Sequence, residues 1–157
     1  MSKLSRPYNT IDDAALGGFK KIMKSYSDWD TYEYGFIVIG APHQMLRQLG
    51  HEGFIDTEMQ YYYTEPHTDR SRSSINHTVS PYAAVMRAFC HTHPSRSNFS
   101  STDFENFKKL RELKAQHKLG YAVSYYLMDY GGQVRRSNSE ETFYRGTTIE
   151  GLDKAQP

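Results

Sequence analysis

An apolar segment that leads, through a short polar stretch, into a helix limits the folds open to this chain. Residues 82–91, YAAVMRAFCH, are short and apolar, which is typical of a strand buried on at least one face. Residues 100–118, SSTDFENFKKLRELKAQHK, predict a helix, because Phe104, Phe107 and the leucines after them recur at every third position and Gly120 follows. The polar residues between the two elements are therefore expected at one end of a sheet.

The remaining elements predict the layers around that sheet. Residues 9–26 predict a first helix that Thr10 can cap, with a Gly17-Gly18 pair that close packing against a sheet would explain. Further strands are predicted at residues 32–40, 57–66, 121–129, 133–137 and 142–149, with a turn at 130–132 that makes a hairpin. The order of elements predicts an α/β sandwich with a mixed, mostly antiparallel sheet flanked by helices.

Other segments show no clear period. We expect residues 41–56 to be an insertion and residues 67–77 to be a polar loop, although residues 73–79 also fit a short strand. The last residues predict a loose tail. At 157 residues the chain is expected to be one domain, 1–157, with its core at about residues 10–150.

Composition excludes several classes of protein. The net charge of +1 gives no basic field for nucleic acid, and one cysteine excludes a thiolate-rich zinc site. The amino terminus lacks the apolar run of a secretory signal, and no segment has the length of a membrane span. We therefore expect a soluble protein made in the cytoplasm, without nucleic-acid or membrane partners; export without a cleavable signal stays open.

His91 and His93 lie at the end of the strand predicted for residues 82–91. In a strand, side chains two positions apart point to the same face about 7 Å apart, so both imidazoles can reach one ion. Such a pair alone is common and is a weak signal. Cupins and amidohydrolases also use it, but with further ligands on distant strands, and no comparable pattern stands out here.

Ser100 and Asp103 follow at the start of the helix predicted for residues 100–118. Their spacing places both on the same side of the first turn, where the helix dipole favours an ionised Asp103. Two imidazoles, one carboxylate and a water make the open tetrahedral site expected of catalytic zinc. The same spacing fits an ordinary capping box, so the residues alone leave a structural and a metal-binding role open.

These residues resemble a known motif. HTHP at residues 91–94, followed by Ser100-x-x-Asp103, resembles the JAMM motif of the MPN-type metalloproteases, although the gap between His93 and Ser100 is one residue shorter than usual. The order of DDAALGGFKKI, EYGF, YYYTEP, HTHP…FSSTD and GYAVSYYLMDYGGQVRR is similar to that of a bacterial JAMM-like domain of unknown function, found alone and in polymorphic toxin proteins. The resemblance implies the JAMM/MPN, cytidine-deaminase-like sandwich.

The resemblance also implies a chemistry. Zn2+ would be held by His91, His93 and Asp103, with a water as the fourth ligand. Glu33, in YEYGF, would take a proton from that water, and Ser100 would donate to the oxyanion. The implied reaction is hydrolysis of a peptide or isopeptide bond in a peptide or protein substrate.

The identity of the glutamate stays open on sequence alone. Glu33 is preferred because it begins the first strand beside a glycine, as the family's glutamate does. Three other glutamates compete for the role: Glu52, Glu58 and Glu65.

Two other functions stay open. MPN-type domains without a metal serve as scaffolds and binding modules, although a scaffold has no need of two histidines, an aspartate and a glutamate together. A toxin or effector domain of an interbacterial or host-directed system would share the chemistry, and an immunity protein would then be its partner.

Overall fold

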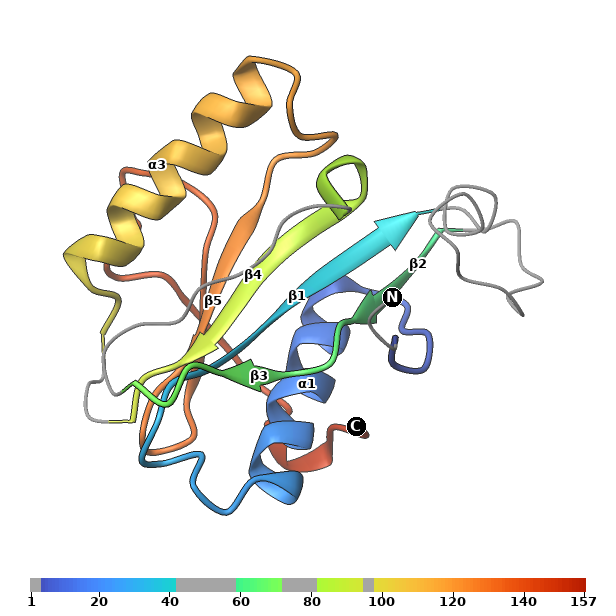
Figure 1. Cartoon of the computed structure of the whole chain (residues 1–157), viewed down its shortest axis with the longest axis vertical. Coiled ribbons are helices and arrows are strands. Elements are labelled where there is room, and N and C mark those ends of the chain that lie inside the picture. Colours follow the sequence, from blue (N-terminus) through green and yellow to red (C-terminus); the bar gives the residue numbers. More distant parts are fainter. Residues whose placement is uncertain (1–3, 42–58, 72–81, 95–97) are drawn as a thin grey trace.

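The structure is a computed structural model that describes residues 4–41, 59–71, 82–94 and 98–157. Its helices are α1 (Ile11–Ser25), α3 (Ser101–Ala115) and the short 3-10 helices η1 (Tyr82–Ala84) and η2 (Leu152–Lys154). Its strands are β1 (Tyr34–Ala41), β2 (Gln60–Tyr63), β3 (His67–Thr68), β4 (Met86–Thr92), β5 (Ser124–Met128), β6 (Val134–Ser137) and β7 (Thr147–Ile149) (Figure 1). No helix in these ranges is both long and apolar enough to cross a bilayer.

The strands form one sheet in the order β2-β1-β4-β5-β6-β7, and β3 pairs with β1 beside β2. Among the strand pairs of the described residues, β4 and β5 are parallel and the others are antiparallel. This confirms the α/β class with a mixed, mostly antiparallel sheet. Parallel neighbours need a crossover connection, and α3 supplies it between β4 and β5. The first turn of α3 is therefore the next element after the carboxyl end of β4.

Each face of the sheet buries its own core. Helix α1 covers one face with Ala15, Phe19 and Ile22. Helix α3 covers the other with Phe107 and Leu110. Side chains alternate between the two faces along β1 and β5, and the tyrosine rings of residues 61–63 likewise lie on both faces of the sheet.

The start of α1 follows the sequence prediction. Thr10 is its N-cap, and the Thr10 hydroxyl accepts a hydrogen bond of 3.0 Å from the Asp13 amide. A Cβ on Gly18 would collide with the ring of Phe36 on β1. The glycine therefore lets the helix approach the sheet closely, as expected.

Several predicted boundaries were wrong. Residues 82–84 form η1 before β4 begins, and the last predicted strand is only β7, because residues 141–145 form a turn. Helix α3 ends at Ala115 instead of residue 118, where His117 takes a φ of 61° and the chain turns. The predicted insertion at 41–56 and the possible strand at 73–79 lie outside the described residues.

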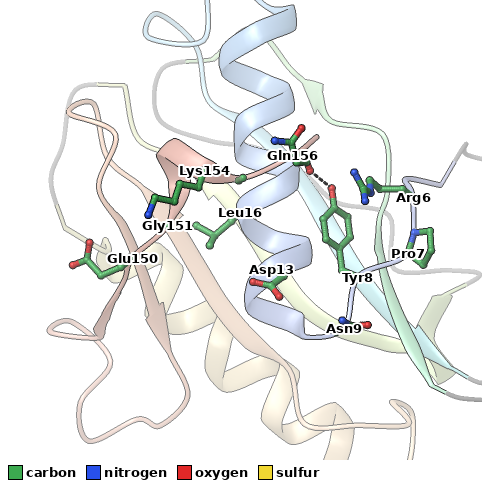
Figure 2. A pocket seen from close by; sticks show the side chains of 11 residues that line it. Arg6, Pro7, Tyr8, Asn9, Asp13, Leu16, Glu150, Gly151, Lys154 and Gln156 are labelled. Carbon is green, nitrogen blue, oxygen red and sulfur yellow. Dashed lines mark hydrogen bonds between the residues drawn. The ribbon is translucent and has the colours of Figure 1, made fainter.

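Two segments that were predicted to be irregular are ordered against the sheet and α1. Residues 67–68, predicted as loop, form β3 and pair with Tyr34 and Gly35 of β1. The tail is not loose, because Leu152 and Ala155 pack against the α1 core. The Tyr8 hydroxyl also donates a hydrogen bond to the carbonyl of Gln156 (Figure 2). The amino- and carboxyl-terminal segments thus meet beside α1.

Candidate metal centre

The sheet register brings the sequence-predicted site residues together. In the antiparallel pair β1/β4, Gly35 lies opposite His91, and continuing this register past the strand ends places Glu33 opposite His93. Asp103 reaches the same place from the first turn of α3, which follows β4. The start of β1, the end of β4 and the first turn of α3 therefore contribute one cluster.

The cluster is compact and buried. The exposed fraction is 2% for Glu33, 3% for His91, 2% for His93 and 9% for Asp103. Glu33 and the two histidines can each offer one ligand atom, with all three atoms within 4.8 Å of one another. The Glu33–His91–His93 group could therefore hold a metal ion.

Distances between donor atoms fit a tetrahedral ion. The two Nε2 atoms of His91 and His93 lie 3.0 Å apart. Nε2 of His91 lies 3.2 Å from Oδ1 of Asp103, and Nε2 of His93 lies 3.2 Å from Oδ2 of the same carboxylate. Metal–ligand distances of about 2.0–2.2 Å at tetrahedral angles separate neighbouring donor atoms by about 3.3–3.5 Å, so the observed separations are shorter by only a few tenths of an ångström. The distances are therefore compatible with an ion beside His91, His93 and Asp103, as well as with one in the Glu33–His91–His93 group.

Glu33 lies further from His93 than Asp103 does. Its Oε1 is 3.9 Å from Nε2 of His93, beyond a direct hydrogen bond. A carboxylate at this distance can bind a small molecule held between itself and the imidazole. The geometry is thus compatible with two roles for Glu33, as one ligand of an ion shared with His91 and His93 or as a group that contacts a bound molecule.

The orientation of the His93 ring is set by a backbone carbonyl. Nδ1 of His93 lies 2.9 Å from the carbonyl oxygen of Asn98. A carbonyl can only accept, so Nδ1 carries a proton, and Nε2 is the nitrogen that faces His91 and Asp103. Metal-bound histidines characteristically donate their second nitrogen in this way. The ring is thus prepared to act as a ligand.

Asp103 completes the cap of α3 and also contacts both imidazoles. Its Oδ2 accepts a hydrogen bond of 2.8 Å from the Ser100 amide, while its own amide donates to the Ser100 hydroxyl at 3.1 Å, which completes a capping box. Burial alone would raise the pKa of Asp103, but attraction to His91 and His93 outweighs it and holds that pKa well below its ordinary value. The two roles that the sequence left open are compatible in one conformation.

Ser100 is the N-cap of α3 and lies three positions before Asp103. Its oxygen accepts from the Asp103 amide, and a hydroxyl that accepts keeps its own proton for donation. The cap therefore does not compete with the predicted donation to an oxyanion.

The competing glutamates differ from Glu33. Glu65 is exposed and lies beside the N-terminal segment with Leu4 and Arg6. Glu52 and Glu58 lie outside the described residues. Of the described candidates, Glu33 is the one in the cluster.

A separate cavity of about 440 Å³ lies between the N-terminal segment, α1 and η2 (Figure 2). Its lining carries both basic and acidic side chains, including Arg6, Lys154, Asp13 and Glu150. None of the four clustered residues lines it, so it is not part of the candidate metal centre.

Two contributors to the cluster were not identified from sequence. The Asn98 carbonyl belongs to the backbone and leaves no residue-type signal. Tyr125 on β5 meets the ring of His91 edge-on, with the centroids 5.8 Å apart. Cys90, which precedes His91 on β4, is fully buried in the core beside α1, and burial raises the pKa of its thiol, as expected of a packing residue.

Comparisons with known proteins give no relative: no family model, no curated protein and no solved structure matches the chain. The resemblance to the MPN-type metalloproteases therefore stays a prediction.

Proposed function

We propose that the protein is a zinc-dependent hydrolase of amide bonds, with a peptide or protein as its substrate. The observation that supports it most is the pair of buried Nε2 atoms, 3.0 Å apart and both beside Asp103, with the tautomer of His93 set by Asn98. The mixed sheet with α1 and α3 on its two faces is also compatible with the JAMM/MPN fold that the motif resembles.

His91, His93 and Asp103 would hold the zinc ion. Two neutral imidazoles and one carboxylate leave a fourth position open, which is the donor set of catalytic zinc sites. When bound, the ion would lower the pKa of a water molecule and polarise the substrate carbonyl.

Glu33 would be the general base. Its carboxylate is buried, and its Oε1 lies 3.9 Å from Nε2 of His93, a separation that one water molecule bound to both can bridge. The same carboxylic acid would then return the proton to the leaving amine, as general acids and bases do in two successive steps. Ser100 would donate its hydroxyl proton to the substrate oxygen as negative charge develops there.

A peptide-library cleavage screen tests this function. Wild type, Glu33→Gln and Glu65→Gln would be compared after zinc loading, with the zinc content of each measured. We expect about one zinc per chain in all three, and loss of about 10²- to 10⁴-fold in rate for Glu33→Gln alone, the usual range for a general base. Glu65→Gln is the matched control because it makes the same chemical change at an exposed position.

Two results would overturn the proposal. The first is a folded, unchelated sample that contains no zinc and takes up none. The second is a Glu33→Gln variant that cleaves at the wild-type rate, since the base would then be another group.

A further inference from the structure

The backbone that carries Glu33 is held by side chains from two other strands. The Thr68 hydroxyl on β3 donates a hydrogen bond of 2.7 Å to the Glu33 carbonyl. The Tyr34 amide donates one of 2.9 Å to the Thr92 hydroxyl on β4. The carbonyl of Glu33 and the amide of Tyr34 belong to the same peptide group. Both polar atoms of that group therefore bond to threonine side chains, where a sheet ordinarily uses backbone partners.

The turn after β3 holds the other side of Glu33. The Glu33 amide donates to the Ser71 carbonyl at 2.8 Å. The Thr68 hydroxyl also accepts from the Arg70 amide at 3.0 Å, and Arg70 has a φ of 56°, in the left-handed region. A non-glycine residue keeps such a conformation only where its surroundings hold it. The segment 68–71 thus bonds both backbone polar groups of Glu33, through the Thr68 hydroxyl and the Ser71 carbonyl.

Thr92 connects the peptide group between Glu33 and Tyr34 to the strand that carries the proposed ligands His91 and His93. It lies between His91 and His93 in sequence, is 1% exposed, and directs its hydroxyl to β1 while its neighbours direct their rings to the site. The hydrogen bond between Thr92 and Tyr34 thereby joins β4 to the start of β1. It lies beside both histidines on one strand and beside Glu33 on the other.

We infer that Thr68 and Thr92 are positioning residues, whose hydroxyls fix the Glu33 backbone and so aim the Glu33 carboxylate at the reacting water. The inference rests on the hydrolase function proposed above. A general base acts only within hydrogen-bond reach of the proton it takes, and misplacement of about 1 Å can cost about 100-fold in rate. Neither threonine contacts substrate in this account; each acts through Glu33.

The chain offers a matched control for the loss of such a bond. On β1, the Ile37 amide donates to the Thr64 hydroxyl at 3.1 Å, and Thr64 is buried. Ile37 lies four residues beyond Glu33, or about 13 Å along an extended strand. Thr64→Val therefore removes the same kind of bond from the same strand, away from the site.

The experiment compares Thr68→Val, Thr92→Val and Thr64→Val, together with Thr68→Ser and Thr92→Ser. Valine keeps the shape of threonine without the hydroxyl, and serine keeps the hydroxyl. Zinc content, kcat and KM on a peptide from the cleavage screen, and the Glu33 position in crystals of the zinc-loaded protein would be measured. We expect full zinc content in every variant. In Thr68→Val and Thr92→Val we expect kcat to be lower by about 10- to 100-fold with little change in KM, and the Glu33 carboxylate to be displaced in the crystals.

Serine at either position is expected to restore most of the rate, and Thr64→Val to leave kcat unchanged. Wild-type kcat with Glu33 in place in both valine variants would overturn the positioning role and leave the hydrolase standing. An equal loss in Thr64→Val would also overturn it, since a general loosening of β1 would explain all three. If Thr92→Val does not fold, Thr68→Val still tests the positioning role, because Thr68 is only half-buried.

Failure of the proposed function gives a different result. A Glu33→Gln variant with full activity, or absence of zinc, would refute the hydrolase. The Glu33 position in the Thr68→Val and Thr92→Val crystals would then still decide whether the threonines fix that carboxylate.

Discussion

Replacement of the N-cap of α3 separates the structural from the catalytic role of Ser100. The Ser100 hydroxyl accepts from the Asp103 amide at 3.1 Å, and the Thr10 hydroxyl accepts from the Asp13 amide of α1 at 3.0 Å. Both helices have 15 residues and both caps face an aspartate three positions on. Thr10→Ala is therefore a matched control for Ser100→Ala.

The expected loss of stability is about the same for both variants. Removing a Ser or Thr N-cap costs about 1 kcal/mol, and for a chain of this size each kcal/mol lowers Tm by about 2–4 °C. Thermal unfolding followed by circular dichroism would measure it. Zinc content should stay near one per chain in both, because neither hydroxyl is a ligand.

The rates should differ. Loss of one oxyanion donor typically costs about 10²- to 10³-fold in kcat, so Ser100→Ala should lose that much while Thr10→Ala keeps the wild-type rate. A Ser100→Ala variant that loses stability and keeps its rate would refute the donor role and leave Ser100 as a cap only. Loss of zinc in Ser100→Ala would instead show that the cap is needed to place Asp103.

Three further changes test other parts of the structure. Chelation should lower Tm by about 5–10 °C relative to a sample with zinc at 100-fold its Kd, a difference of about 2.7 kcal/mol; an unchanged Tm would argue against any bound metal. Burial raises the pKa of Tyr63 from 10.0 to about 12, so its contribution to stability is present below pH 10 and is lost as the pH rises through about 12. The free energy of unfolding of Tyr63→Phe, measured with denaturant, should fall less steeply over that pH range than that of wild type. An equally steep fall in both proteins would contradict this. Gly18→Ala should cost about 1–3 kcal/mol because the Cβ would meet Phe36, whereas Gly131→Ala, whose Cβ would stand 3.4 Å from Asp129, should cost less; equal denaturation midpoints would count against the close approach of α1.

The sequence predicted the parts of the fold that depend on local pattern. Apolar runs located β1 and β4, the spacing of apolar residues located α3, and Thr10 located the start of α1. These elements bury enough apolar surface for their pattern to show in the sequence. The motif also named His91, His93 and Asp103 correctly as neighbours in space.

The elements that were missed depend on pairing between distant residues. Strand β3 has two residues in a polar segment, and only its pairing with β1 makes it a strand. The ordered tail depends on contacts with α1. Arg136 on β6 binds Asp12 of α1 at 2.7 Å across 124 positions, a contact that no local pattern indicates. Backbone contributions such as the Asn98 carbonyl leave no signal in residue types.

Anomalous scattering at the zinc edge from crystals of the zinc-loaded protein tests the central claim most directly. The account predicts one peak within about 2.0–2.2 Å of Nε2 of His91, Nε2 of His93 and a carboxylate oxygen of Asp103, with Glu33 outside bonding distance. Absence of a peak, or a peak away from these three side chains, would contradict it.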